Sequence, residues 1–339
     1  MAINIGNTNY NGEVLESLLA LAATGNELVE RGLIHIEPNI SYKFSIPRLK
    51  TGTMLQKHKE QPQDGDSKGN FNYSEKELNP VDFMAFTTFN PRSFERIWRI
   101  WQPKGPLVFA ELPEEGQNAL LAELAKQVKF ELGYHFINGV YAESGDTNLF
   151  NGIIYRMAED VDVIVVSPNK SEEIPASGTG ETAVPAVPAV PYTNVLERLK
   201  ALRKKIPTTL RASSGLRILM SIADFDAYDD ELTARHAKNS DDTEVNAKRY
   251  KGITLEPLAN WPDGLLVATI CGMGYDTNLW AGVNLQDDMD VIKIGLLENA
   301  GERYFFKMLM KADTQIAFGE EVVVMDSRQN PQFTVAPEA

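Results

Sequence analysis

The longest periodic run in the chain is LPEEGQNALLAELAKQVKFELGYHFINGVYAE, residues 112–143. Apolar side chains recur in it at every fourth position, as on one face of an α-helix: Leu120, Leu124, Val128, Leu132, Phe136 and Val140. Pro113 and the two acidic residues behind it suit a helix N-terminus. About 30 residues of helix would be ~45 Å long, more than twice an average globular helix. A helix of this length sets one dimension of the fold.

Two alternating stretches flank a polar segment nearer the N-terminus. The first alternates over Ile40, Tyr42, Phe44 and Ile46, and the second over Val81, Phe83, Ala85 and Thr87. Each pattern is typical of a β-strand. The polar stretch between them, from about Gln56 to about Asn79, is longer than an ordinary connection. We therefore expect strand, long polar tip, strand: an extended two-stranded arm.

The tip of this arm contains DGDSKGNFNYSE, residues 64–75, which nearly fits a calcium-binding loop. Asp64, Asp66, Gly69 and Glu75 fall at positions 1, 3, 6 and 12 of that motif. Lys68, however, falls at position 5, where it places an ammonium group in the cation's site. The flanks also lack the two helices that the motif needs. We interpret the segment as an exposed Gly- and Asp-rich loop and expect no bound metal.

The rest of the chain alternates between helix and strand patterns. Helices are expected at 14–22, 91–101 and 193–207, and strands at 152–157, 161–166 and 320–326. Residues 215–232 read as strand, turn and helix, and residues 253–270 as strand, loop and strand. Tyr304, Phe306, Met308, Met310 and Ala312 alternate with polar residues, which predicts a long strand with one buried face. The repeat Ala-Val-Pro within 171–191 predicts an extended surface excursion.

The composition excludes several function classes. Thirty-three basic and 47 acidic residues give a formal charge of −14, which disfavours a protein whose main task is to grip nucleic acid. The N-terminus lacks a signal-peptide pattern, and no apolar run reaches the ~18 residues of a membrane span. A single cysteine, Cys271, rules out an internal disulfide framework and is expected to be a buried packing residue. We therefore expect a chain kept in a reducing cytoplasm.

No catalytic or cofactor motif stands out. A phosphate-binding loop, a dinucleotide fingerprint and a GxSxG elbow are all missing. The four histidines lack partners at metal-ligand spacing, and His135 is expected to be a hydrogen-bonded interior residue. The basic run RLKALRKK, residues 198–205, is either a nucleic-acid patch or, as we favour, the outer face of an amphipathic helix. The sequence favours an interaction or structural role without a cofactor.

The order of these elements resembles the major capsid protein family of tailed bacteriophages, whose shell fold is shared with encapsulins. Residues 11–50 look like the N-terminal arm leading into the first arm strand, and SIPRLKTGTML…VDFMAFTTF resembles the extended E-loop. Residues 111–143 look like the spine helix of the peripheral (P) domain, residues 195–232 are similar to the axial (A) domain, and residues 292–324 look like its closing strands back to the P-domain.

This resemblance implies an α+β capsid fold with an N-terminal arm, a β-hairpin E-loop, a spine helix in a P-domain and a mixed α/β A-domain. The implied divisions are an arm at 1–38, the E-loop with flanking strands at 39–90, the P-domain at 91–150, the A-domain at 151–284 with a low-complexity insertion at 171–191, and the return to the P-domain at 285–339. Some family members carry an N-terminal scaffolding segment of about a hundred residues. Here the arm helix begins near Gly12, which leaves assembly control to a separate protein or to an earlier cleavage.

The implied function is self-assembly into an icosahedral shell around a double-stranded DNA genome, with assembly in the host cytoplasm and no sequence-specific DNA binding. The implied partners are further copies of the chain in hexamers and pentamers, a scaffolding protein, a portal and decoration proteins. The physics agrees, because a two-stranded arm is not stable alone in water and needs a neighbour. A shell without a basic inner wall also lets packed DNA slide.

Two alternatives stay open: an encapsulin-like cellular compartment, and a calcium-dependent or hydrolytic α/β enzyme. For the shell function, the candidate intersubunit contacts lie in the N-terminal helix and the arm: Leu15, Leu18, Leu19, Phe44, Ile46, Arg48, Lys50, Lys57, Asp64, Lys68, Phe71, Phe83 and Phe86.

Overall fold

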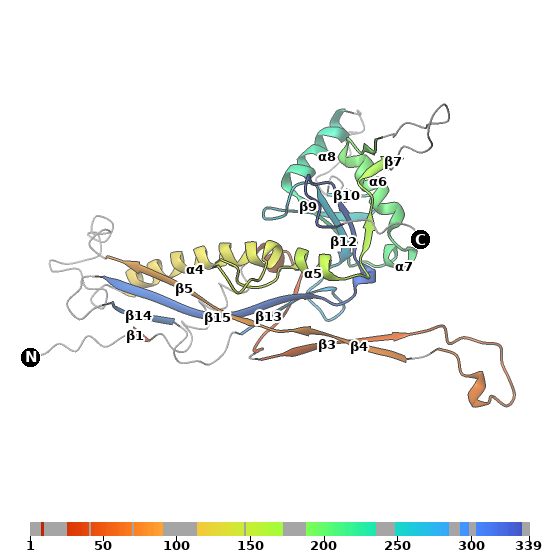
Figure 1. Cartoon of the computed structure of the whole chain (residues 1–339), viewed down its shortest axis with the longest axis horizontal. Helices are drawn as coiled ribbons and strands as arrows, with labels where there is room; N and C mark the ends of the chain where they lie inside the picture. The colour runs from red at the N-terminus through yellow and green to blue at the C-terminus, as the bar shows by residue number, and fades with distance from the viewer. Residues whose placement is uncertain are drawn as a thin grey trace, which may run out of the picture.

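A single long strand, β15 (Tyr304–Ile316), organises the elongated body of the molecule. The computed structural model describes residues 8–9, 26–40, 42–69, 71–90, 114–145, 147–171, 188–234, 248–284, 292–297 and 303–333. Figure 1 shows three parts: a body in which a long helix lies along a sheet, a lobe with a second sheet, and a hairpin that projects from the body. Within the described residues, no helix combines the length and apolarity needed to cross a bilayer.

β15 belongs to what we call the long sheet. Along one edge it pairs with β5 (Val81–Phe89), and its other edge is shared by β14 (Ile292–Leu296) and β13 (Leu279–Val283). All three neighbours run antiparallel to β15. β2 (His35–Glu37) adds to β13 in parallel, and β1 (Thr8–Asn9) adds to β14. The predicted alternation of β15 is confirmed, because Tyr304, Phe306, Met308, Met310 and Ala312 are all buried.

The helix α4 (Glu114–Asn138) covers one face of the long sheet (Figure 1). Leu124, Val128, Leu132 and Phe136 face the core, as their four-residue spacing predicted. The helix has 25 residues, fewer than the ~30 expected, because it ends at a tight backbone crossing. A Cβ on Gly139 would lie 2.4 Å from the carbonyl oxygen of Phe150, so only glycine allows this approach. Val140 therefore lies beyond the helix and is exposed.

The crossing leads into α5 (Ile153–Glu159), where the sequence predicted a strand. That prediction was wrong. The adjacent Ile153 and Ile154 favour a strand locally, but Ile153, Ile154 and Met157 are buried together at helical spacing against the long sheet. Burial of this face overrides the local preference.

The second sheet, which we call the lobe sheet, has six strands in the order β10 (Arg249–Tyr250), β11 (Ile253–Leu258), β9 (Leu216–Ser221), β12 (Leu265–Ile270), β16 (Val323–Asp326) and β6 (Ile164–Val166). β9 and β11 are parallel, as are β16 and β6, and the other neighbours are antiparallel. The predicted strands at 253–270, 161–166 and 320–326 are confirmed within one to three residues at their ends.

Both faces of the lobe sheet are buried, which joins the lobe to the body. Val324 and Val267 face the main core that includes α4 and α5. Val323 and Met325 face a second core formed with α6 (Val195–Lys205), α7 (Thr208–Arg211) and α8 (Ile222–Ala234). α6 confirms the helix predicted at 193–207, and it buries Val195, Leu199 and Leu202 together with Ile206, which follows it. The Glu231 carboxylate of α8 accepts hydrogen bonds from the first two amides of α6, at 2.7 and 3.1 Å.

The projecting hairpin (residues 44–78) corrects the predicted pairing of the arm. β3 (Phe44–Thr51) pairs with β4 (Phe71–Leu78), whereas β5 pairs with β15. The sequence predicted β5 as the second arm strand because its alternation is clear, and it interpreted β4 as polar loop. Of the β4 side chains that the structure describes, Tyr73, Glu75 and Glu77 are exposed and Leu78 is buried. The sequence of β4, FNYSEKEL, lacks the one-sided apolar pattern that identifies a half-buried strand.

The remaining short elements are α2 (Glu27–Glu30), η1 (Asp64–Asp66), η5 (Gly319–Glu321), and the pair β7 (Asn169–Ser171) and β8 (Val190–Pro191). β7 and β8 border the Ala-Val-Pro segment, whose residues 172–187 lie outside the described residues. The predicted helices at 14–22 and 91–101 lie outside them as well.

The core of α4 provides a matched stability test. Phe136 is fully buried and its ring packs edge-on against Phe150, with the two centroids 5.6 Å apart. Phe136→Ala should lower the free energy of unfolding by about 3–5 kcal/mol, because it leaves a cavity. Phe130 on the same helix is 63% exposed, so Phe130→Ala should cost less than about 1 kcal/mol. Urea unfolding of the purified chain measures both, and equal losses would contradict this packing.

Candidate intersubunit surface

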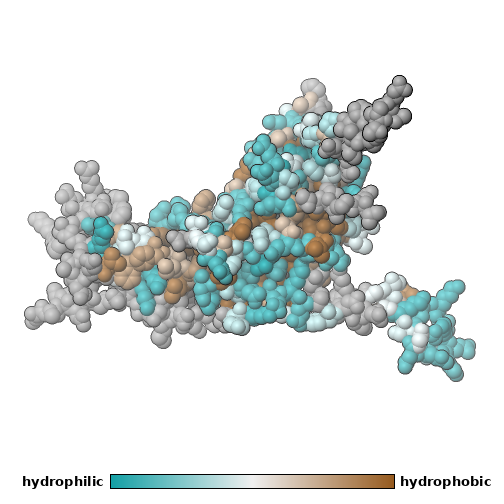
Figure 2. Space-filling view, viewed as in Figure 1, coloured by the Kyte–Doolittle hydropathy of each residue, from teal (hydrophilic) through white to brown (hydrophobic). Residues whose placement is uncertain are grey.

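The projecting hairpin extends away from both sheets, and its tip touches neither of them (Figure 1). Described side chains in residues 52–69 are exposed almost throughout, and Leu55 is 92% exposed. Figure 2 shows the tip as largely hydrophilic. A segment of this length and exposure contributes little to the chain's own core. Its side chains are therefore available to another molecule.

The base of the hairpin, in contrast, is packed into the body. Ile46 and Leu78 are buried in a small cluster with Ile40, Trp280 and Ala317. Lys76 of β4 forms an ion pair with Asp160 at the end of α5, and both side chains are largely buried. The side-chain amide of Gln315 on β15 donates to the carbonyl of Glu77 at 3.1 Å. The direction of the hairpin is thus set by contacts at its base.

Asp313 of β15 completes this anchor. Its Oδ2 accepts a hydrogen bond from the backbone N–H of Asn79 at 2.8 Å, and Nη2 of Arg156 donates to its two oxygens at 3.0 and 3.2 Å. The carboxyl is almost fully buried, and this burial raises its pKa in spite of the nearby guanidinium. Asp313 therefore links the long sheet, α5 and the residue that follows β4.

Polar contacts on the hairpin hold its two strands and its tip in shape. Glu75 accepts hydrogen bonds from Ser45 across the strands and from Tyr73, and these contacts lower the pKa of its carboxyl. In the tip, Lys59 forms an ion pair with Asp66, which lowers the pKa of that carboxyl, and Asp66 also accepts from the backbone N–H of Gln63. The ammonium group of Lys59 is thus paired with Asp66, one of the carboxylates of the calcium-like sequence.

The residues predicted as intersubunit contacts fall into three groups. Lys57, Asp64 and Lys68 are exposed at the tip, and Phe86 is exposed on β5. Ile46 is buried in the hairpin base, Phe44 stacks near Trp280, and Phe83 faces the chain's own core beside Phe150. The side chains of Arg48, Lys50 and Phe71, and the whole of Leu15, Leu18 and Leu19, lie outside the described residues. Contact of any of these residues with a neighbour stays a prediction.

Sequence reasoning missed an apolar patch on the long sheet, on the face opposite α4. Met84 on β5 lies directly across from Leu309 on β15, and both are exposed. Beside them the rings of Phe86 and Phe305 stack with centroids 6.3 Å apart. The one sequence signal was that outward positions of β5 carry Met and Phe rather than polar residues. Cross-strand pairing with β15, which the sequence did not reveal, brings them together.

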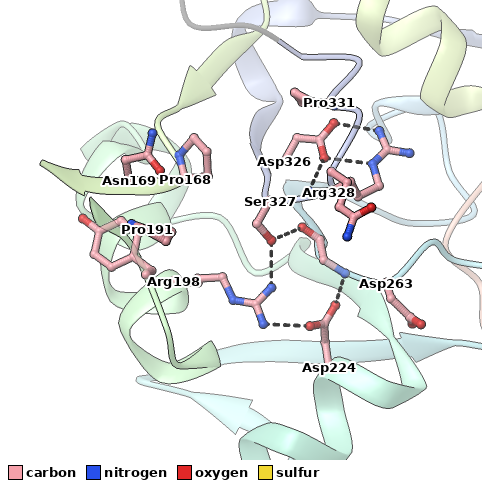
Figure 3. Close-up of a pocket in the computed structure, with 13 residues that line it drawn as sticks. Pro168, Asn169, Pro191, Arg198, Asp224, Asp263, Asp326, Ser327, Arg328 and Pro331 are labelled. Carbon is pink, nitrogen blue, oxygen red and sulfur yellow. Dashed lines mark hydrogen bonds and ion pairs between the residues drawn. The ribbon is translucent and has the colours of Figure 1, made fainter. Parts of the chain in front are cut away.

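A cavity of about 560 Å³ lies in the lobe, between α6, the start of α8 and the segment after β16 (Figure 3). Arg198 donates to Asp224 at 3.0 Å and to Ser327 at 3.0 Å. Asp224 also accepts from the backbone N–H of Gly264 at 2.7 Å, and Ser327 donates to the carbonyl of Gly264 at 2.7 Å. These contacts connect three segments of the lobe through one arginine.

The same cavity contains a second, tighter pair. Arg328 donates from Nε and Nη2 to the two oxygens of Asp326, at 2.8 and 2.7 Å. Backbone amides of Arg328 and Gln332 add two more hydrogen bonds. Burial raises the pKa of Asp326, but the hydrogen bonds and charge of Arg328 outweigh it, so the net pKa is lowered. The carboxylates of Asp224 and Asp326 both accept hydrogen bonds from arginine side chains and backbone amides of the lobe. These contacts indicate a structural role for the two residues.

The groups considered for chemistry are dispersed. In the described part of the chain no three His, Cys, Asp or Glu side chains gather in a metal-binding arrangement. Cys271 is buried, as predicted, and burial raises the pKa of its thiol far above the usual range. His135 was expected to be hydrogen-bonded, but its buried Nδ1 has no partner among the described residues. Desolvation lowers the pKa of its imidazole.

Known proteins match this chain in structure but not in sequence. No protein-family model matches the sequence, and no curated protein does so either. A chain from the procapsid of satellite phage P4, which includes the size determination (Sid) protein, superposes with a TM-score of 0.62 at 13% identity. The match covers 95% of this chain and 93% of that one. The protein has the fold of the tailed-bacteriophage major capsid proteins.

Two further structures support this capsid fold. The capsid of an empty GTA particle matches with a TM-score of 0.51 at 10% identity, over 89% of this chain and 96% of that one. The capsid of a native GTA particle matches with a TM-score of 0.50 at 10% identity, over 96% and 95%. Because these matches span 89–96% of this chain, the capsid fold extends over nearly its whole length.

The anchor of the hairpin in this capsid-type subunit can be tested with two lysines. Lys76→Met leaves Asp160 largely buried without its cation, which should lower the free energy of unfolding by about 1–3 kcal/mol. Amide protons of β4 should also exchange faster. Lys43→Met removes an exposed cross-strand pair with Glu77 and should cost at most about 1 kcal/mol. Hydrogen–deuterium exchange and urea unfolding measure both effects. Indistinguishable variants would show that the anchor lies elsewhere.

The pair in the lobe cavity predicts a pH dependence. The pKa of Asp326 is lower in the folded chain than in the unfolded chain, so its carboxylate stabilises the fold above the unfolded pKa of about 4, and this is lost as the pH falls through the folded pKa. The difference in stability between the natural chain and Asp326→Asn should therefore be largest near pH 7 and shrink in acid.

Thermal unfolding from pH 7 to pH 3 measures this difference. Asp263→Asn is the matched control, because Asp263 lines the same cavity but is exposed. A gap between the natural chain and Asp326→Asn that stays constant over this range would contradict the proposed charge pairing.

Proposed function

We propose that this protein is a major capsid protein that self-assembles into the icosahedral shell of a virus with a double-stranded DNA genome. The observation that carries the proposal is a capsid-type subunit whose hairpin is anchored at its base and exposed at its tip. A projection that is anchored at its base and whose described tip residues are exposed is what one subunit needs to reach a second. The apolar patch around Met84 and Leu309 supplies a further surface to be covered.

The parts of the subunit take the following roles in this proposal. The projecting hairpin is the E-loop, and α4 is the spine helix of a P-domain built on the long sheet. The lobe is the A-domain, which closes around the symmetry axes of hexamers and pentamers. The proposed divisions remain 1–38, 39–90, 91–150, 151–284 and 285–339. β5, although inside the second range, belongs structurally to the P-domain sheet.

The shell would assemble in the host cytoplasm with a separate scaffolding protein, a portal and decoration proteins, and without a cofactor or enzymatic activity of its own. The formal net charge of −14 supports a shell wall that encloses DNA without binding it tightly.

Electron microscopy of the purified protein tests the proposed shell. Closed particles that contain nuclease-protected DNA support it. Closed particles that contain protein cargo would instead indicate a cellular compartment, and a small soluble oligomer would overturn the shell function.

The tip of the hairpin can be removed without disturbing its base. Replacing residues 52–70 by Asn-Gly leaves β3 and β4 joined by a two-residue turn of a type that favours hairpins. We expect the variant to fold, with an unchanged near-ultraviolet circular dichroism spectrum. In sedimentation experiments, we expect it to form no shells. A removal that begins at 56 and ends at 79 would be less informative, because it also deletes the buried Leu78.

A single substitution gives a sharper version of the same test. Burial of Leu55 against a neighbour would be worth about 1.5–3 kcal/mol per contact, so Leu55→Ser should weaken association about tenfold or more. Val161, on the loop after α5, is 95% exposed, and Val161→Ser serves as the control for loss of an exposed apolar side chain. Assembly as a function of protein concentration measures both. Equal effects would show that the tip does not enter a specific contact.

A further inference from the structure

The basic run at residues 198–205 divides between two sides of α6. Arg198 turns toward Asp224 in the cavity of Figure 3. Arg203 instead lines a second cleft, formed by the end of α6, α7 and the strands β9, β10 and β11. Lys204 and Lys205 are exposed. The expectation of a plain outer helix face therefore describes only part of this run.

The second cleft is lined by five cationic side chains from five different places in the lobe: Arg203, Arg211, Arg217, Arg249 and Lys251. Its remaining lining is Ser213, Ser214, Thr254, Gly252, Leu216 and Ile253. Among the described residues no carboxylate lines it. In a protein with a net charge of −14, five like charges around one cleft raise each other's electrostatic free energy unless an anion is present.

Two of the five cations are held by the protein. Arg211 donates to the carbonyls of Ile206 and Lys204, at 2.9 and 3.0 Å, at the end of α6. Arg217 donates to the hydroxyl of Thr254 at 2.9 Å, and its Nε lies 3.8 Å from Glu256, which is outside the cleft lining. These contacts fix the two guanidinium groups in place and leave part of each group available.

The other three cations have no carboxylate partner within the described residues. Nε of Arg203 is buried and has no hydrogen-bond acceptor there. Arg249 forms no ion pair in this part of the chain, and the ammonium of Lys251 lies 5.5 Å from the ring centroid of Tyr250. A buried N–H without an acceptor is unfavourable, and such groups in folded proteins are commonly satisfied by a water or an ion.

We propose that this cleft binds a small multivalent phosphate ion. Guanidinium groups match the geometry of phosphate oxygens with paired hydrogen bonds, and a lysine adds a point charge. The hydroxyl groups of Ser213, Ser214 and Thr254 supply further donors. The cleft has a volume of about 230 Å³, below the range of pockets for drug-sized ligands, which selects a compact ion over a larger molecule.

Inorganic pyrophosphate is the probe. Calorimetric titration of the purified full-length chain at low salt should show one site per subunit, and binding should raise the unfolding temperature. Arg249→Gln combined with Lys251→Gln should weaken binding at least tenfold, because it removes two of the five positive charges that line the cleft. Both residues are exposed, so their replacement leaves the lobe core intact. Arg203→Gln should weaken binding to a similar extent.

Lys204→Gln combined with Lys205→Gln is the matched control. It removes the same charge from the same region but from outside the cleft, and it should change the affinity less than twofold. Absence of pyrophosphate binding would overturn the proposal. Equal weakening by the control pair would overturn it too, because it would indicate attraction by overall charge. Binding of short duplex DNA or an acidic peptide in place of pyrophosphate would likewise reject a small-ion site.

Discussion

The buried carboxylate of Asp313 is the contact on which the arrangement of the parts depends. It lies on the central strand of the body, binds the guanidinium of Arg156 on α5, and accepts the amide of Asn79 at the junction of β4 and β5. A charge at this depth is tolerated only with partners, and each partner belongs to a different segment. The requirement to neutralise one carboxylate therefore fixes the body, the helix α5 and the base of the hairpin relative to one another.

β15 extends this control to the lobe. Hydrogen bonds occupy both of its edges, and the chain continues from its end through η5 directly into β16. Successive residues of β16 face two different cores: Val324 faces the core of the body, and Val323 faces the core under α6. Burial of both faces of the lobe sheet makes independent movement of the lobe costly, because it would expose apolar surface on one side. The subunit thus has a rigid frame.

Sequence alone predicted the elements in which one face is buried. α4, α6 and β15 place apolar residues toward the core at regular spacing, which makes their buried stripes visible in the sequence even though Phe130 and Leu309 are exposed. β4 and α5 were missed for opposite reasons. β4 pairs with β3, and its sequence lacks a one-sided apolar pattern. α5 begins with two β-branched residues, Ile153 and Ile154, which favour a strand locally but are buried together with Met157 in a helix.

For the candidate site, too, the sequence predicted local properties but not those that depend on the pairing of distant segments. The exposed tip around Lys57 and Lys68 was predicted from its polarity, since exposure is a local property. The inward position of Phe83, the patch of Met84 with Leu309 and the cationic cleft around Arg203 all depend on which strands pair and which helices pack together. No local pattern encodes such pairings, so these features became visible only once distant segments were placed side by side.

In the proposed shell, the hairpin separates the residues that stabilise the fold from those that contact a neighbour. A two-stranded hairpin alone is at best marginally stable in water, yet this one has a base of buried Ile46 and Leu78 and an ion pair at Asp160. The contacts at the base set the direction of the hairpin, and the described side chains of its tip are almost all exposed. Because a preorganised projection loses little conformational freedom on docking, more of its contact free energy goes to association. In the proposed shell, substitutions at the tip are therefore expected to change association without weakening the fold, whereas substitutions at the base are expected to affect both.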